Sequence, residues 1–99
     1  MNTDALQLVI ETVESEADDL GYEHLRRVDA DTPLFGGEGG VDSLSLVRLV
    51  AALERATERR FGKRVVLADD RAMSMRSSPF RSVGSLAALV SDRMGATDA

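Results

Sequence analysis

Residues 40–62 are GVDSLSLVRLVAALERATERRFG, and this stretch carries the signals for both ends of a helix. Asp42 belongs to the residue types preferred as N-caps, and Gly62 can adopt the left-handed conformation that ends many helices. Two arginines near the end of the stretch would complement the negative end of the helix dipole. The stretch therefore predicts a helix from Ser43 to about Arg60.

Apolar residues lie on two sides of this predicted helix. One set recurs at the three- and four-residue spacing of a single helical face, which predicts packing against the rest of the domain. The second set projects from a different side, and it either widens the core face or contacts a partner. The first set is Leu46, Leu49, Val50 and Leu53, and the second is Leu44, Val47 and Ala51.

The N-terminal segment carries a second helical pattern. Its apolar residues share one face, Asn2 and Thr3 are candidate caps, and Gly21 is a candidate stop. These signals predict a helix that ends before Gly21. The apolar residues of this face are Leu6, Val9, Ile10, Val13, Ala17 and Leu20.

After this first helix the helical spacing lapses until Val41, and a proline followed by a run of glycines argues against any helix there. We expect a long loop, pinned to the core by Leu34 and Phe35. His24 lies near the start of the loop with no second metal ligand close to it in the sequence. We therefore expect His24 to be an ordinary surface or half-buried side chain, and we expect no metal site.

The C-terminal part predicts three further segments. Val65-Val66-Leu67 predicts an extended connector, because a single strand would leave its backbone groups without partners. Asp69 can cap a short helix through about Met75. Ser82 can cap a last helix that ends near Gly95.

Together these segments predict an all-α fold, a four-helix bundle with a long loop between the first two helices and a short third helix. We expect a single domain over residues 1–99, with an ordered core at about residues 3–94. No apolar run approaches the roughly 20 residues that cross a bilayer, so no membrane insertion is expected. The acidic start is unlike a secretory signal, and we expect a cytoplasmic protein.

The net charge of -5 conceals an asymmetry, because the first 25 residues contain acids but no Lys or Arg. The bases downstream alternate with an apolar helix pattern, and the chain has only one tyrosine and three phenylalanines to stack on bases. We therefore expect no nucleic-acid partner. The chain also lacks cysteine, so any thiol chemistry must come from an added group.

The pair Asp42-Ser43 lies where a modification is chemically possible. If Asp42 is the cap, Ser43 takes the first helical position, with its hydroxyl outside the hydrogen-bonded ladder. A phosphodiester attached there is favoured by unpaired N–H groups and by the helix dipole. On the local pattern alone, Asp42-Ser43 is more often an ordinary helix cap than a modification site.

The stretch from Gly40 to Leu44, with the helix that follows it to Gly62, resembles the phosphopantetheine attachment helix of acyl carrier proteins. The resemblance extends along almost the whole chain in the order and spacing of its segments. These are the acidic first helix, the loop with Asp31-Thr32-Pro33-Leu34, the Asp-Ser-Leu helix, the short third helix and Ser82-Val83-Gly84-Ser85-Leu86 at the start of the last helix.

The resemblance implies a non-catalytic carrier protein in which Ser43 accepts 4'-phosphopantetheine from coenzyme A. A separate phosphopantetheinyl transferase would attach the arm, and Asp42 would help to place a metal ion and the serine during loading. The arm would carry acyl intermediates as thioesters to acyl-activating or acyl-transferring enzymes of a fatty-acid, polyketide or other specialised acyl pathway. Leu44, Val47 and Ala51 would meet these enzymes, and the carrier is expected to be a monomer.

Two departures from that family are visible. Fatty-acid carriers expose an acidic side of this helix, whereas here Arg48 and Arg55 share it with Glu54 and Glu58. We expect Arg48, Glu54 and Arg55 in the docking surface and a partner of acidic or mixed character, with weak docking to ordinary fatty-acid synthase enzymes. The segment over residues 66–81 is also longer than in the family.

Three alternatives remain. Aminoacyl and peptidyl carriers share the fold and the serine, although the acidic first helix favours an acyl carrier. Asp42, Ser43 and His24 could form a hydrolase triad, but an aspartate adjacent to the serine would be occupied in capping the helix. An unmodified interaction module could use the second apolar stripe to bind a partner helix.

Overall fold

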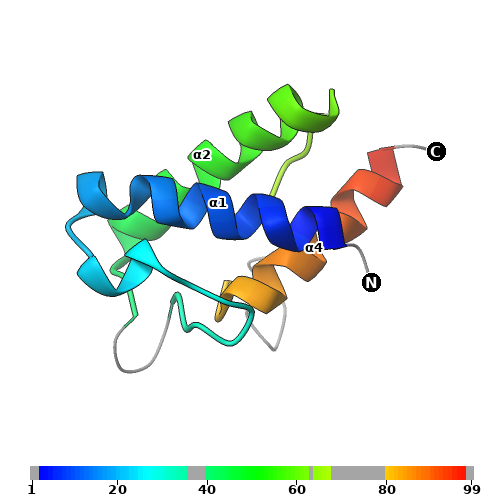
Figure 1. Cartoon of the computed structure of the whole chain (residues 1–99). Coiled ribbons are helices and arrows are strands. Elements are labelled where there is room, and N and C mark those ends of the chain that lie inside the picture. The colour runs from blue at the N-terminus through cyan, green and yellow to red at the C-terminus, as the bar shows by residue number, and fades with distance from the viewer. Residues whose placement is uncertain (1–2, 36–39, 63, 68–79, 98–99) are drawn as a thin grey trace.

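The computed structural model describes residues 3–35, 40–62, 64–67 and 80–97. Within them the chain forms three α-helices and one 3₁₀ turn, and its only strand-like pairings are two isolated bridges (Figure 1). This confirms an all-α fold for the described residues, whereas the short helix expected at 69–75 lies outside them. The elements are α1 (Thr3–Leu20), η1 (Glu23–Arg26), α2 (Ser43–Phe61) and α4 (Val83–Thr97).

The first helix, α1, packs against both α2 and α4 and is the centre of the fold. Of its predicted apolar face, Val9, Val13 and Ala17 are buried, whereas Leu6, Ile10 and Leu20 are partly buried against the core. The helix ends where Gly21 takes a positive φ of 82°, and the Gly21 N–H donates to the carbonyl of Ala17 at 2.9 Å. A glycine stop at this position is what the sequence predicted.

The second helix, α2, has the bounds that its end signals predict, with one further residue at Phe61. Asp42 is the N-cap, and its Oδ1 accepts a hydrogen bond from the Ser45 N–H at 2.7 Å. At the other end Gly62 is left-handed, with φ of 69°, and its N–H donates to the Glu58 carbonyl at 2.9 Å. Both ends thus make the local hydrogen bonds that their end signals predict.

The loop between α1 and α2 was predicted to contain no helix, and this was wrong for four residues. Glu23–Arg26 form the 3₁₀ turn η1, in which Leu25 is completely buried. A 3₁₀ turn is too short to produce a helical spacing of apolar residues, so the sequence pattern did not reveal it. Leu34 is buried as expected, Phe35 packs partly buried against the core, and Val28 is a further anchor of the loop.

The last helix, α4, begins at a hydroxyl cap, since Ser82 Oγ accepts from the Ser85 N–H at 3.1 Å. It was expected to end near Gly95 but continues to Thr97. A glycine in helical conformation costs only about 1 kcal/mol relative to alanine, so it does not by itself end a helix. The loop joins the start of α4 through main-chain bonds from Leu34 N–H to the Arg81 carbonyl at 2.7 Å and from Val83 N–H to the Thr32 carbonyl at 3.0 Å.

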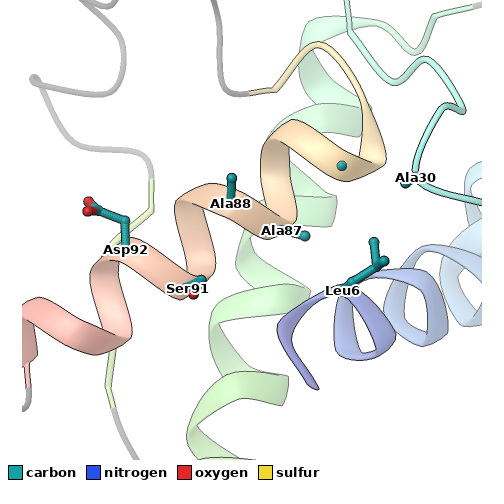
Figure 2. A pocket seen from close by; sticks show the side chains of 7 residues that line it. Leu6, Ala30, Ala87, Ala88, Ser91 and Asp92 are labelled. Atoms are coloured by element: carbon teal, nitrogen blue, oxygen red, sulfur yellow. The ribbon is translucent and has the colours of Figure 1, made fainter. Parts of the chain in front are cut away.

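A cavity of about 390 Å³ lies where α1, the loop and α4 meet (Figure 2). The loop approaches α4 closely at Gly84, whose N–H donates to the Ala30 carbonyl at 2.8 Å. A Cβ added at Gly84 would lie 2.9 Å from that oxygen, so the contact requires glycine. The lining residues are Leu6, Ala30, Gly84, Ala87, Ala88, Ser91 and Asp92.

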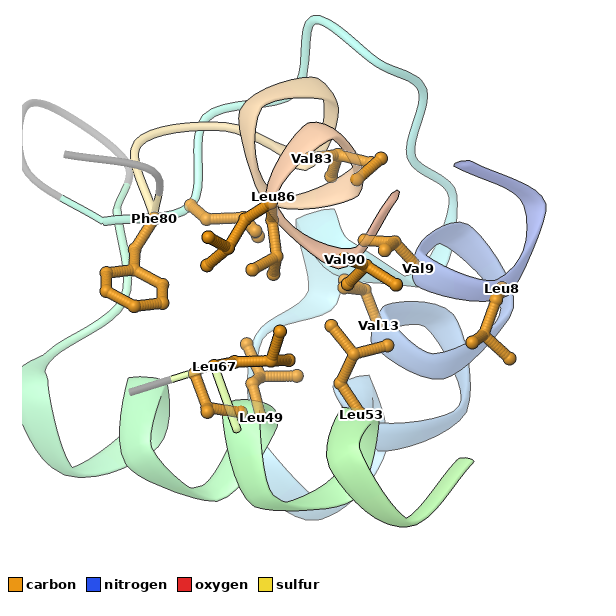
Figure 3. Close-up of a cluster of buried hydrophobic side chains, with 14 of the residues drawn as sticks. Leu8, Val9, Val13, Leu49, Leu53, Leu67, Phe80, Val83, Leu86 and Val90 are labelled. Atoms are coloured by element: carbon orange, nitrogen blue, oxygen red, sulfur yellow. The ribbon is translucent and has the colours of Figure 1, made fainter. Parts of the chain in front are cut away.

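The core is formed by side chains from all three helices and the segments between them (Figure 3). The connector Val65-Val66-Leu67 forms no helix or strand, in line with a connector, and Val65 and Leu67 are buried whereas Val66 is exposed. Thr57 is also fully buried, and its hydroxyl donates to the Leu53 carbonyl at 2.8 Å. The largest fully buried apolar side chains are Leu25, Leu34, Leu49, Leu53, Leu67, Leu86, Val9, Val13, Val83 and Val90.

Candidate functional site

Ser43 is the first residue of α2 and directly follows the cap residue Asp42. The first N–H groups of a helix have no partners within it, and the Asp42 carboxylate satisfies that of Ser45. This hydrogen bond from the Ser45 backbone holds the pKa of Asp42 below its ordinary value, because it favours the charged carboxylate. The amino end of α2 therefore combines the predicted serine, an ionised cap and the positive end of the helix dipole.

The residues before Ser43 are tied to distant parts of the chain. The Val41 N–H donates to the Leu34 carbonyl at 2.6 Å, and Phe35 and Val41 form an isolated bridge. The next N–H, that of Asp42, donates to the phenol oxygen of Tyr22 at 3.1 Å. Tyr22 was not among the site residues predicted from the sequence. The available signal in the sequence was its position, because this tyrosine directly follows the glycine that ends the first helix. A partly buried phenol hydroxyl usually has a hydrogen-bond partner.

The second apolar stripe of α2 faces outward. Leu44 and Val47 are 79% and 64% exposed, and Ala51 is partly exposed. Within the described residues the exposed large apolar side chains are these two and Val66, at 57%. The stripe therefore does not widen the core at Leu44 and Val47, and an apolar patch of this kind marks a surface that can meet a partner.

An open groove of about 310 Å³ runs beside this stripe, between α2 and the extended connector. Glu54, expected in the docking surface, has an internal role here, because its Oε2 accepts a hydrogen bond from the Leu67 N–H at 2.8 Å. That bond holds the connector against α2. The groove is lined by Leu46, Val47, Val50, Ala51, Glu54, Val66 and Phe80.

The two arginines expected near the site have different surroundings. Arg48 lies between two acids of α1, with its Nε 3.7 Å from Glu16 Oε1 and its Nη2 3.7 Å from Asp19 Oδ2. Arg55 is exposed and forms no ion pair within the described part of the chain. The positive charge of Arg48 is thus partly balanced by α1, whereas that of Arg55 faces solvent.

The structure gives no support to a hydrolase triad. His24 is exposed, and its ring makes an edge contact with Tyr22, with centroids 5.8 Å apart. The carboxylate of Asp42 is engaged with the Ser45 N–H. Across the described ranges no group of three or more acidic or histidine side chains could hold a metal ion. In the same ranges no helix has the length and apolar character needed to cross a membrane.

Comparisons with known proteins identify the family. A family model described as the phosphopantetheine attachment site matches residues 10–72, which cover most of α1, the loop and all of α2. No significant match was found among curated proteins or among solved structures. The chain therefore belongs to the family of phosphopantetheine attachment domains, non-catalytic carriers that bind 4'-phosphopantetheine covalently on a serine.

Proposed function

We propose that this chain is an acyl carrier protein in which Ser43 bears the 4'-phosphopantetheine arm and acyl intermediates travel on it as thioesters. The observation that carries the proposal is the position of Ser43 at the first residue of α2, after an ionised cap and beside an exposed apolar stripe. Carriers of this family interact with phosphopantetheinyl transferases and acyl-handling enzymes.

The choice among serines supports Ser43. The matched range contains Ser15, Ser43 and Ser45. Ser15 lies inside α1, where its hydroxyl donates to the Thr12 carbonyl at 2.9 Å. Ser45 lies within the first turn of α2, and its N–H is bound by the cap. Ser43 is the one that takes the first helical position, where an attached phosphodiester meets free N–H groups.

The chain also fits the group chemically. The amino end of α2 provides the positive end of a helix dipole for the negative charge of a phosphodiester. The arm supplies a terminal thiol for thioester chemistry, and the chain has no cysteine of its own. Asp42 supports loading by capping the helix and by carrying a carboxylate next to the serine.

The outer face of α2 suits docking to acyl-handling enzymes. Leu44, Val47 and Ala51 supply apolar contacts, and Arg55 adds a positive charge that has no ion-pair partner among the described residues. A partner of acidic or mixed character complements this face, and Arg48 contributes less because acids of α1 lie next to it. An acyl cargo is favoured over an aminoacyl one because the groove along α2 is lined mainly by apolar side chains.

Intact mass spectrometry tests the assignment of Ser43. The purified chain, incubated with coenzyme A and a broad-specificity phosphopantetheinyl transferase, should gain the mass of one phosphopantetheinyl group. Ser43→Ala should gain nothing, and the matched control Ser45→Ala should be loaded as the wild type is. An unmodified wild type, or a loaded Ser43→Ala variant, would contradict the proposal.

A further inference from the structure

We propose that Tyr22 is a positioning residue for loading, whose phenol oxygen holds the start of α2 in the conformation that a phosphopantetheinyl transferase recognises. The proposal rests on the assignment of Ser43 above. Its central observation is the hydrogen bond from the Asp42 N–H to the Tyr22 oxygen at 3.1 Å. This bond ends one residue before the serine and joins the start of α2 to the end of α1.

Tyr22 is itself firmly held. Its N–H donates to the Ala17 carbonyl at 3.1 Å, and its carbonyl accepts from the Leu25 N–H at 3.1 Å. Its ring packs against the hydrophobic core and meets the edge of His24. A residue whose main chain is bound to α1 and η1, and whose ring packs on the core, can act as a support for a segment 20 residues further along.

The bond to Tyr22 adds to the one made by the preceding residue, in which the Val41 N–H donates to the Leu34 carbonyl at 2.6 Å. The N–H of an N-cap residue takes no part in the helical ladder, so α2 itself does not fix it. The Asp42 side chain orders the residues after it, through Ser45, whereas the bond to Tyr22 orders its own main chain.

This arrangement predicts a specific kinetic effect. If the start of α2 samples other conformations, a loading enzyme binds only the fraction with the competent geometry, and the apparent KM rises as that fraction falls. The chemical step, once the carrier is bound, is unchanged. Loss of one neutral hydrogen bond of typical strength shifts such an equilibrium by about fivefold, so the competent fraction falls by at most that factor.

The test compares loading kinetics of three apo carriers with one transferase and saturating coenzyme A. Tyr22→Phe removes only the hydroxyl, and we expect KM for the carrier to rise by up to about fivefold with kcat unchanged. Ser82→Ala removes a hydroxyl that caps a different helix, α4, and should leave both constants unchanged. Amide hydrogen exchange should become faster at Asp42 in Tyr22→Phe and not in Ser82→Ala.

Each outcome has a definite meaning. A folded Tyr22→Phe with wild-type KM, or an equal rise of KM in Ser82→Ala, would overturn the role of Tyr22 while leaving Ser43 as the attachment site. Failure to load the wild type would overturn both proposals. Should Tyr22→Phe not fold, fluorinated tyrosine can replace the single tyrosine of the chain and weaken its oxygen as an acceptor. KM should then rise by a smaller factor, and an unchanged KM would again be contrary to the proposal.

Discussion

Helices α1 and α2 have nearly equal lengths, 18 and 19 residues, and each buries one apolar face in the same core. Their outer faces differ. The exposed residues of α1 are polar or charged, such as Gln7, Glu11 and Asp18. The outer face of α2 carries Leu44 and Val47, which are among the most exposed apolar side chains of the described residues.

The difference separates what folding requires from what it does not. A helix on the surface of a domain needs one apolar stripe, and α1 has no more than that. The second stripe of α2 adds little to the stability of the isolated chain, because its large side chains remain mostly in water. A feature that folding does not explain lies beside the proposed attachment serine, and this is why a docking role accounts for it.

The largest expected effect tests the two faces of α2 directly. Leu49→Ala removes a fully buried side chain and should lower the free energy of unfolding by about 2–5 kcal/mol. Leu44→Ala removes the same atoms from the exposed face and should change it by no more than about 0.5 kcal/mol. Urea denaturation followed by circular dichroism measures both.

The exposed variant, Leu44→Ala, should instead affect the contact with partner enzymes. Leu44→Ala should slow acyl transfer by the enzyme that acylates the carrier, although its stability is unchanged. If Leu44→Ala were as destabilising as Leu49→Ala, the two faces of α2 would not differ as the structure indicates. If it left transfer unaffected, Leu44 would have no part in docking.

Local signals were sufficient to predict most of the helical fold. The bounds of α1 and α2 follow from Gly21, Asp42 and Gly62, each of which acts on residues within four positions of itself. The position of Ser43 after its cap was predictable for the same reason. The outward direction of Leu44 and Val47 was left open, because periodicity gives the angle between two stripes but not which of them a neighbour covers.

The contacts that sequence reasoning missed are long-range and join a side chain to a distant main chain. Tyr22 binds the Asp42 N–H, Glu54 binds the Leu67 N–H and Glu14 binds the Val28 N–H. No periodicity or composition signal accompanies such pairs, because the acceptor is placed by tertiary packing. Glu54 was accordingly expected to face only a partner.

A second prediction uses the fact that both helices hold a following segment with a glutamate. Glu14 accepts from the Val28 N–H at 3.0 Å and Glu54 from the Leu67 N–H at 2.8 Å. Replacing either glutamate by alanine should lower the free energy of unfolding by about 1 kcal/mol, since it leaves an N–H without its acceptor. Replacement by glutamine retains an acceptor oxygen and should cost less.

The two glutamates should differ in function. Glu54→Ala loosens the connector that forms one side of the groove, so it should also alter acyl transfer. Glu14→Ala loosens the loop at Val28, which does not line the groove. It should leave acyl transfer unchanged even if it destabilises the fold as much as Glu54→Ala does. Equal effects on transfer would mean that the groove beside α2 is not part of the working surface.

A third and smaller effect concerns the cap of α2. Asp42→Ala should lower Tm by a few degrees, because it removes the acceptor for the Ser45 N–H, whereas Asp42→Asn keeps a capping oxygen. The pKa of Asp42 is depressed by that hydrogen bond, so its charge stabilises the fold above the ordinary pKa. This contribution is lost as the pH falls through the depressed value, below roughly pH 4. Thermal melts at several pH values should therefore show wild type and Asp42→Asn converging in acid, and a constant difference would contradict the cap.

The smallest expected effect lies at the contact between the two helices. Arg48 lies 3.7 Å from oxygens of Glu16 and Asp19 on α1, and surface pairs of this kind contribute about 0–1 kcal/mol. Arg48→Ala should therefore leave the free energy of unfolding nearly unchanged. Arg48→Glu adds a third carboxylate next to these two, so it should be slightly destabilising at low salt and less so at high salt.

The charge reversal also tests the character of the partner. A partner with acidic residues opposite α2 would bind Arg48→Glu more weakly than the wild type, and Arg55→Glu more weakly still, because Arg55 has no acid of α1 beside it. Titration with the acylating enzyme at two salt concentrations measures both variants. Stronger binding of either reversed variant would mean that the partner surface is basic, in which case the mixed charge on α2 would weaken docking rather than direct it.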